Sequence, residues 1–219
     1  MTTNQYATGN SKTLIAFQDD WLVLDIGSGH NPHPRANVLA DRFFEDDAER
    51  TGKGIVLDEA KPFVIADACA MPFKDGAFDF LVCSHVAEHI DDVPAFCAEL
   101  QRVSKAGYVE TPSKFTELIR HPPNHRWFVS SKGSLLRFEK APVDHPLGAL
   151  GKLFFSLYFY GTRQVANRNV YAFADGVGQP LHFFLENLRG GLRLLWRLGK
   201  AVTYTRFRWQ GKFQWQISD

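Results

Sequence analysis

Short apolar runs that each stop at a glycine or a polar residue are the feature that most constrains this fold. The first run, at residues 21–26, is broken by one acid and ends at Gly27. Three runs share this format, and a weaker fifth run precedes Pro112; they lie at residues 37–41, 63–67, 78–84 and 108–110. Runs of this length are typical of strands that are buried on both faces of a parallel sheet.

A helix is predicted between the fourth and fifth runs. The apolar residues that repeat there at helical spacing are Val93, Phe96, Leu100 and Val103. Asp92 is a plausible N-cap in front of Pro94. Strands that alternate with helical segments indicate an α/β chain. Beyond Pro112 no such unit repeats, and the alternation of apolar residues at 207–217 around residues 210–212 predicts a β-hairpin.

The formal net charge of +1 hides a division along the chain. Residues 1–100 carry 17 acidic and 7 basic side chains, a net charge of −10, which leaves 7 acidic and 18 basic side chains, a net of +11, at residues 101–219. The balanced total excludes a strongly basic nucleic-acid binder and an acidic tail protein.

Localisation is predicted from three weak signals. Residues 1–12 do not have the pattern of a secretory signal. The longest apolar run, at residues 147–160, is short for a bilayer and contains Lys152. Cysteine is present three times, without CxxC spacing, at Cys69, Cys83 and Cys97. A reduced, cytoplasmic protein is the simplest account.

Chemically active residues follow the predicted strand ends, which is where open α/β sheets bind ligands. Gly27 and Gly29 flank Ser28 in a tight turn whose backbone can present N–H donors. Asp41 can accept two hydrogen bonds from a ribose diol. Asp67 can accept a hydrogen bond from an exocyclic amine. These groups predict a site for an adenosine that carries a polar extension.

The same residues resemble the class I S-adenosylmethionine-dependent methyltransferases, in particular the small-molecule, methyltransferase type 11-like branch. The blocks that match in order are residues 23–29, 39–41, 66–73 and 78–89, followed by the helical residues 99–104. The resemblance implies a Rossmann-like sheet of seven mostly parallel strands with helices on both faces. We expect a single domain over residues 1–219, with a cofactor-binding half at 1–112 and, at 113–219, the remaining strands and the elements that shape a substrate site.

The resemblance also implies roles for individual residues. The loop residues Gly27, Ser28 and Gly29 would contact the methionine part of S-adenosylmethionine, and Asp25 would organise this loop. Asp41 would hold the ribose hydroxyls. Asp67, with the backbone of Ala68, would hold adenine, and S-adenosylhomocysteine would be the product.

One departure from the family lies between the glycine loop and Asp41. The family normally has a full helix there, but Pro32 and Pro34 leave room for a turn at most. The roles of His30 and Asn31 therefore cannot be transferred from the family.

Three alternatives compete with this interpretation. A dinucleotide fingerprint would need a third glycine or an alanine where the chain has Pro32. The residues His85, Glu88 and His89 spell HxxEH, the motif of a zinc-dependent hydrolase, although His85 directly follows a predicted strand. A non-catalytic scaffold that binds S-adenosylmethionine is the third alternative. We assign no metal ligands.

Candidate catalytic residues are His85, at the end of the fourth predicted strand, and Glu110, at the end of the fifth. A capping or packing role remains open for both. His125 and Arg126 are candidate substrate-binding residues, because they lie in a proline-rich segment expected to overhang the site. Prolines between His121 and His125 weaken a metal interpretation of that pair.

The acceptor is predicted from chemistry and charge. The resemblance implies methyl transfer, and we expect an oxygen of a small or glycan-type molecule to be methylated. The basic half of the chain favours an anionic or lipid-linked acceptor. Basic residues at 189–212 are compatible with peripheral membrane contact, whereas nucleic acid is not expected as a partner. The sequence does not fix the oligomeric state.

Overall fold

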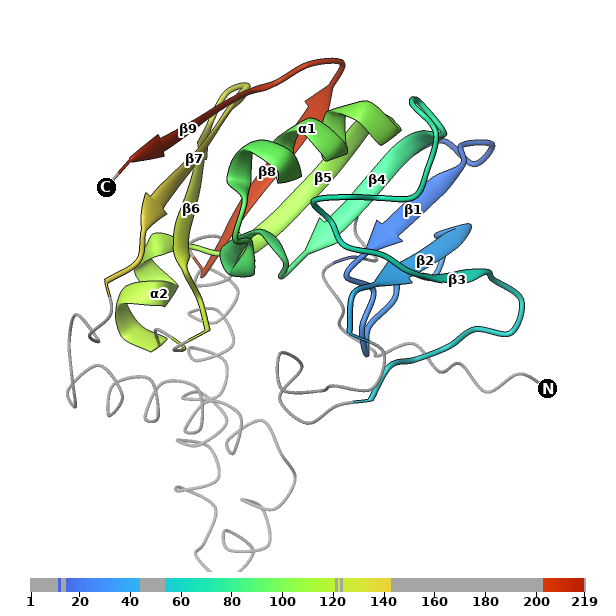
Figure 1. Cartoon of the computed structure of the whole chain (residues 1–219), viewed down its shortest axis with the longest axis horizontal. Helices are drawn as coiled ribbons and strands as arrows, with labels where there is room; N and C mark the ends of the chain where they lie inside the picture. Colours follow the sequence, from blue (N-terminus) through green and yellow to red (C-terminus); the bar gives the residue numbers. More distant parts are fainter. Residues whose placement is uncertain are drawn as a thin grey trace, which may run out of the picture. The chain divides into compact units, whose positions relative to one another are not determined.

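The computed structural model describes residues 12, 15–43, 54–120, 122, 124–142 and 203–218 (Figure 1). The chain divides into two compact units, of which the first comprises residues 1–112, 124–141 and 205–219. The second comprises residues 113–123 and 142–204, and its described part includes helix α2 (Lys114–Arg120). The expectation of one domain over residues 1–219 stays a prediction.

The main sheet has the parallel strands that the apolar runs predict and the Rossmann-like topology that the resemblance implies. Its strands are β1 (Val23–Ile26), β2 (Val38–Asp41), β3 (Phe63–Ile65), β4 (Phe78–Ser84), β5 (Ser104–Pro112) and β8 (Tyr204–Gln210). They lie in the order β3-β2-β1-β4-β5-β8, and the neighbours from β3 to β5 pair in parallel. Because β1 pairs with both β2 and β4, the winding direction switches at the carboxyl end of β1, where such sheets bind ligands.

Helix α1 (Val93–Val103) covers one face of this sheet, as its apolar spacing predicts (Figure 1). The Asp92 carboxylate caps the helix by accepting a hydrogen bond from the N–H of Ala95 at 2.9 Å. Phe96 and Leu100 are fully buried in the same apolar cluster as Leu24 and Leu81 of the sheet. Burial of side chains of this size contributes about 1.5–3 kcal/mol each.

The opposite face is covered in a different way from the family pattern. Val23, Phe80 and Val82 point to this face and pack against Ile15 and Phe17 from the segment in front of β1. The connection from β1 to β2, residues 27–37, contains turns and no helix, which confirms the expectation of a turn at most. The N-terminal segment therefore covers sheet surface on the side of the sheet where the family pattern has a helix between β1 and β2.

A second, three-stranded sheet departs from the sequence-based expectation. It contains β6 (Trp127–Lys132), β7 (Leu135–Lys140) and β9 (Gln214–Ser218). In the described part of the chain the main sheet thus has six strands, not seven. β6 and β7 are antiparallel, whereas β9 runs parallel to β7.

The predicted hairpin at residues 207–217 is wrong, although both of its strands exist. β8 lies beside β5 in the main sheet, and β9 lies beside β7 in the second sheet. The physical reason is the close approach at Gly107 of β5, where a Cβ atom would lie 2.2 Å from the ring of Trp209 in β8. Alternation of apolar residues shows that a strand has a buried face, but it does not identify the neighbouring strand.

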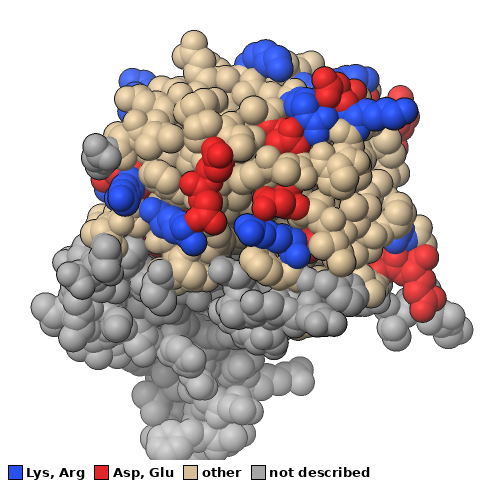
Figure 2. Space-filling view, viewed as in Figure 1, with Lys and Arg blue, Asp and Glu red and all other residues tan. Residues whose placement is uncertain are grey.

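Charged residues from the two parts of the sequence pair with one another in the folded structure, and Figure 2 shows acidic and basic groups side by side on one face. The Lys105 ammonium lies 2.8 Å from the Asp79 carboxylate, and Arg126 pairs with Asp91. The charge division along the sequence is thus in part a division between partners of ion pairs. Among the described residues, no helix is long and apolar enough to cross a membrane.

Candidate functional site

The glycine loop at the end of β1 is held against β2 by backbone hydrogen bonds. The N–H groups of Gly27 and Ser28 donate to the carbonyl oxygen of Ala40 at 2.8 and 3.0 Å. Gly27 has a φ of +70°, and a Cβ atom there would lie 2.2 Å from Cγ2 of Val86. This loop therefore requires glycine both for its backbone conformation and for its packing.

Asp41 at the end of β2 is connected to the glycine loop. Its carboxylate accepts hydrogen bonds from the N–H of Gly29 at 3.0 Å and from the N–H of Phe43 at 3.1 Å. The side chain is buried, so these bonds fix the carboxylate beside the loop. The structure thus brings together the two groups for which the resemblance implies contacts to methionine and ribose.

Asp25 on β1 lies in the interior and organises the chain that follows the loop. Its carboxylate accepts a hydrogen bond from the N–H of His33 at 2.7 Å and pairs with the ammonium of Lys12. Burial raises the pKa of Asp25, and the positive charge of Lys12 opposes this shift. The pairing with Lys12 was not predicted, because no spacing rule connects residues of an irregular segment to a strand.

Asp67 and Ala68 follow β3 and are placed next to the end of β2. The Asp67 carboxylate accepts a hydrogen bond from the N–H of Cys69 at 2.8 Å and lies 3.4 Å from the Arg42 guanidinium. Ala68 is buried. The N–H of Ala66 donates to the carbonyl oxygen of Asp41 at 3.0 Å, which joins this segment to the ribose candidate.

These residues fit a bound adenosine with a polar extension. The hydroxyl oxygen of Ser28 is buried in the glycine loop and has no hydrogen-bond partner in the structure, so the loop offers an uncompensated polar group to a ligand. Asp41 and Asp67 lie at the ends of neighbouring strands, where they can accept bonds from hydroxyl and amine groups.

His85 directly follows β4 in a strained backbone conformation, with a φ of +59°. Its N–H donates to the carbonyl oxygen of Glu110 at 2.8 Å, and its Nδ1 lies 3.2 Å from Oε1 of the buried Glu88. Partial desolvation of the imidazole by its neighbours opposes protonation, but the hydrogen bond and charge of Glu88 raise the pKa of His85 overall. Burial likewise acts to raise the pKa of Glu88, and the contact with His85 lowers it overall.

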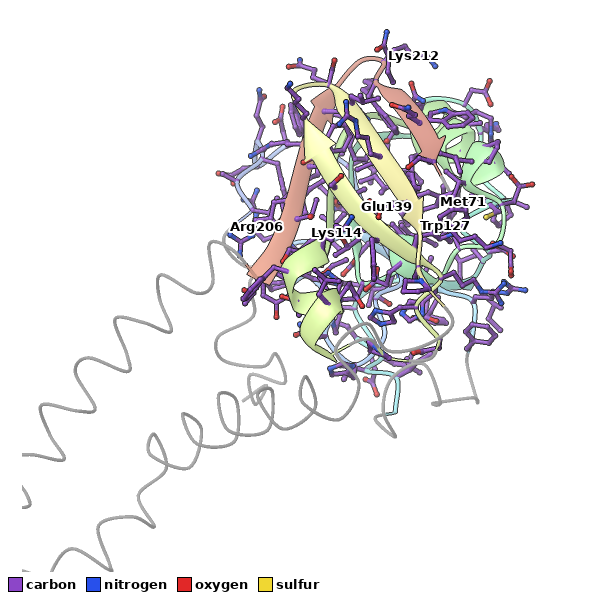
Figure 3. All side chains as sticks on the ribbon, turned by 90° about the vertical axis from the view of Figure 1, so that its left-hand side faces the viewer. Met71, Lys114, Trp127, Glu139, Arg206 and Lys212 are labelled. Atoms are coloured by element: carbon purple, nitrogen blue, oxygen red, sulfur yellow. The ribbon has the colours of Figure 1, made fainter. Side chains whose placement is uncertain are left out.

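The Glu110 carboxylate is buried in a network that crosses from β5 to Arg206 of β8, which is labelled in Figure 3. Its Oε2 accepts a hydrogen bond from the Tyr108 hydroxyl at 2.7 Å and another from Nε of Arg206 at 2.9 Å. Burial raises the pKa of Tyr108, and the hydrogen bond to Glu110 acts in the same direction. These contacts support the packing role that the sequence leaves open for Glu110.

His125 and Arg126 lie in front of β6 and beside the short 3-10 helix η3 (Ala87–His89). The N–H of Arg126 donates to the Glu88 carbonyl oxygen at 2.8 Å, while its guanidinium pairs with Asp91. The His125 ring meets the His89 ring at a centroid distance of 4.6 Å and an interplanar angle of 88°. The structure thus brings His125 to the residues that follow β4, while its binding of a substrate stays a prediction.

The zinc motif predicted as an alternative is not formed as the sequence spells it. Such a motif needs both histidines on one helix face, but η3 begins at Ala87 and His85 precedes it in a left-handed conformation. Glu88 and His89 are instead grouped with His125. No short-range spacing predicts this group, because 35 residues lie between His89 and His125 in the sequence. The basic stretch at residues 189–212, for which the sequence suggests membrane contact, is described only from residue 203, so its residues 189–202 lie outside the described part of the chain.

A family model described as a methyltransferase domain matches residues 38–109. This confirms the resemblance to class I S-adenosylmethionine-dependent methyltransferases for the part of the chain that contains β2 to β5.

Curated relatives match only part of their own length. An ajmaline N-methyltransferase from Rauvolfia serpentina is 39% identical over 51 residues, which cover 23% of this chain and 18% of the relative. A ubiquinone/menaquinone biosynthesis C-methyltransferase from Desulfotalea psychrophila is 28% identical over 93 residues, covering 39% of this chain and 37% of the relative. The chain thus spans less than half the length of these relatives.

Solved structures are similar at low identity. The YcgJ protein from Bacillus subtilis is 22% identical with a TM-score of 0.37, over 49% of this chain and 55% of that protein. An S-adenosylmethionine-dependent methyltransferase from Methanosarcina mazei is 18% identical with a TM-score of 0.37, over 64% of this chain and 79% of that protein.

Proposed function

We propose that this chain, in which residues 38–109 match a methyltransferase domain, is a class I S-adenosylmethionine-dependent methyltransferase that transfers a methyl group to an oxygen of a small or glycan-type, anionic acceptor. The observation that carries the proposal is the link between the Gly29 N–H and the Asp41 carboxylate. It unites, in one place, the two groups that the resemblance assigns to the methionine and ribose parts of the cofactor.

The residues around the loop would hold S-adenosylmethionine in the way that the resemblance implies. Gly27, Ser28 and Gly29 provide a backbone that a ligand can approach closely, and Asp25 fixes the chain beyond them through the N–H of His33. Asp41 would accept hydrogen bonds from the ribose hydroxyls, and Asp67 with the backbone of Ala68 would hold adenine. When bound, S-adenosylmethionine supplies a methyl group on a positively charged sulfur.

His85 is the group that we assign to the acceptor side. It follows β4 next to the glycine loop, and about half of its side chain is exposed, so a hydroxyl group can reach it. Its imidazole would take the proton of the acceptor hydroxyl while the new carbon–oxygen bond forms and the carbon–sulfur bond breaks. Positioning of the two reactants would account for much of the rate acceleration.

The anionic character of the acceptor rests on the excess of bases after residue 100. We extend this proposal to contact with an anionic membrane surface through the basic stretch at 189–212. Lys212 and the other described residues of this stretch supply its carboxyl end.

Calorimetry with S-adenosylmethionine and S-adenosylhomocysteine tests the cofactor. We expect saturable binding of both by the full chain, with one site per chain. Absence of binding for both would overturn the proposal.

Transfer of a labelled methyl group into fractionated extract from a strain that lacks the protein tests the acceptor. We expect label in an acidic, small-molecule or glycolipid fraction, and release of the label by conditions that cleave ethers or esters. Label that stays on nitrogen or carbon would refute the oxygen acceptor, while leaving methyl transfer itself intact. Binding of the cofactor without any labelled product would instead favour the non-catalytic scaffold.

A further inference from the structure

Three side chains around η3 form a group that the proposed transfer of a methyl group does not use. Glu88 and His89 come from η3, and His125 comes from the segment in front of β6. One potential ligand atom from each side chain lies within 4.8 Å of the other two. We propose that Glu88, His89 and His125 bind one divalent transition-metal ion.

The Glu88 carboxylate is the first reason for this assignment. The side chain is 1% exposed, and Oε1 lies 3.2 Å from Nδ1 of His85. Its second oxygen, Oε2, is buried and has no hydrogen-bond partner in the structure. Leaving a buried charged oxygen without a partner is unfavourable, and a coordinated cation removes this cost. His85 would then hold the Glu88 carboxylate in position through its contact with Oε1.

The His89 ring is oriented as a metal ligand would be. Its Nδ1 lies 3.1 Å from the carbonyl oxygen of Asn124. A carbonyl oxygen can only accept a hydrogen bond, so Nδ1 carries the proton and the lone pair of this ring is on Nε2. Metal-binding histidines usually have such a second partner, which fixes the ring and its tautomer.

The segment that carries His125 is attached firmly to η3 and to the residue that follows it. The Arg126 N–H donates to the Glu88 carbonyl oxygen at 2.8 Å, and Nε1 of Trp127 donates to the Ile90 carbonyl oxygen at 2.7 Å. The Arg126 guanidinium is directed to Asp91, so it does not take the place of a cation at Glu88. The perpendicular packing of His125 on His89 brings the two imidazoles together.

The donor set favours certain metals. Two imidazole nitrogens and one carboxylate oxygen suit Zn²⁺ and other first-row transition metals, whereas Mg²⁺ and Ca²⁺ prefer sites made of oxygen atoms. Zn²⁺ binds such ligands at about 2.0–2.2 Å, so its ligand atoms lie roughly 3–4 Å apart. The present separations, which are within 4.8 Å, would therefore have to shorten when the metal binds.

A metal held by three side chains keeps at least one position open for another ligand. Resting on the proposed function, this position would accept the oxygen of the methyl acceptor, since the group contacts His85 through Glu88. A metal ion there favours the deprotonated form of a hydroxyl group. The acceptor class is then narrowed to molecules whose oxygen can bind a transition metal.

The test measures metal binding directly, without activity. Chelator-treated full-length chain is titrated by calorimetry with Zn²⁺, with Mn²⁺ and with Mg²⁺. We expect one equivalent of Zn²⁺ or Mn²⁺ to bind, with Mg²⁺ at least about tenfold weaker. Absence of saturable binding of both Zn²⁺ and Mn²⁺ to the wild-type chain overturns the proposal.

Three variants locate the site. Glu88→Gln and His125→Ala should each weaken metal binding by about 10–100-fold, and Asp19→Asn, which changes an exposed carboxylate that pairs with Arg35, should leave it unchanged. Equal affinity in all three variants would mean that the metal binds elsewhere, which also overturns the proposal. Binding of S-adenosylhomocysteine to the same samples confirms folding and separates the two hypotheses. Metal binding without nucleoside binding contradicts methyl transfer alone, and the reverse result contradicts the metal site alone.

Discussion

The two carboxylate oxygens of Asp25 lie 3.0 and 3.1 Å from the ammonium of Lys12, and both side chains are almost completely excluded from solvent. The segment that precedes β1 therefore supplies the countercharge for the buried acid of β1. A buried ion pair of this kind makes folding sensitive to the loss of either partner.

Replacing Lys12 tests this dependence. Lys12→Met leaves a buried, unpaired carboxylate, and we expect the free energy of unfolding to fall by about 3–5 kcal/mol. Urea unfolding followed by tryptophan fluorescence measures the change. Lys105→Met is the matched control, because Lys105 pairs with Asp79 on the surface and such pairs contribute about 0–1 kcal/mol. Equal losses in the two variants would contradict the burial of the Lys12 pair.

Asp41 is predicted to determine affinity for the cofactor. Asp41→Asn removes the charge that would accept bonds from the ribose hydroxyls, so we expect S-adenosylhomocysteine to bind about 10–100-fold more weakly in calorimetry. Asp19→Asn changes an exposed carboxylate that pairs with Arg35, and its affinity should match that of the wild type. If Asp41→Asn binds S-adenosylhomocysteine with the dissociation constant of the wild type, Asp41 is not part of the cofactor site.

Gly27→Ala separates backbone strain from steric overlap. The substitution combines a φ of +70° with an overlap at Val86, whereas Gly211 has a φ of +73° and open space around it. We expect Gly211→Ala to cost about 1–3 kcal/mol of unfolding free energy and Gly27→Ala to cost more. Adding Val86→Ala to Gly27→Ala removes the overlap, so the double variant should lose only about as much unfolding free energy as Gly211→Ala. Thermal unfolding of the four proteins provides the comparison, and no recovery would place the strain elsewhere.

His33 predicts a specific dependence of stability on pH. Its Nδ1 accepts a hydrogen bond from the Arg35 N–H at 3.0 Å, and burial lowers its pKa to about 4. The unfolded chain therefore binds a proton between about pH 6.5 and pH 4 that the folded chain excludes, so stability falls as the pH drops through this window.

The lowering of the His33 pKa from 6.5 to about 4 corresponds to about 3 kcal/mol of unfolding free energy. His33→Asn keeps an acceptor atom for Arg35 but does not titrate. Urea unfolding at pH 7.5 and pH 5 should therefore show a smaller loss of stability in this variant than in the wild type. If wild type and His33→Asn lose the same unfolding free energy between pH 7.5 and pH 5, groups other than His33 cause the acid sensitivity.

Variants in the Glu110 network are expected to lower the stability of the fold without changing proton transfer in the reaction. Tyr108→Phe removes a hydrogen bond to a buried carboxylate, and we expect a loss of about 1.5–3 kcal/mol in unfolding free energy. Arg206→Met should also destabilise the fold, because it removes the positive partner of Glu110. Once an acceptor is known, Tyr108→Phe should leave the pH dependence of transfer unchanged. A shifted profile would indicate that Glu110 takes part in proton transfer.

The sequence predicts the local elements of this fold better than their partners. β4 begins and ends where its apolar run does, and α1 begins after the predicted cap at Asp92, because burial and capping are local signals. β5 is longer than predicted, since it follows α1 without a turn and includes polar Lys105 at its start. The partners of β8 and β9 depend on contacts such as that of Gly107 with Trp209, which no periodicity reveals.

The candidate site shows the same limit. Gly27 and Asp41 were placed correctly at neighbouring strand ends, because the order of the blocks fixes where their strands end. The pairs Lys12–Asp25 and Glu110–Arg206 join distant parts of the sequence, and side-chain chemistry alone allows many such combinations. The group of Glu88 with His125 is of the same kind, since it depends on how the chain returns to η3 before β6.

The position of β8 beside β5 has a consequence for synthesis on the ribosome. β1 to β5 leave the ribosome early, but the strand that protects the edge of β5 is made only after residues 113–203. An unprotected strand edge is prone to pair with other chains. Until β8 arrives, the nascent chain would thus depend on chaperones or on rapid elongation to avoid aggregation. Shortening the chain from its carboxyl end should for this reason reduce yield before it affects the glycine loop.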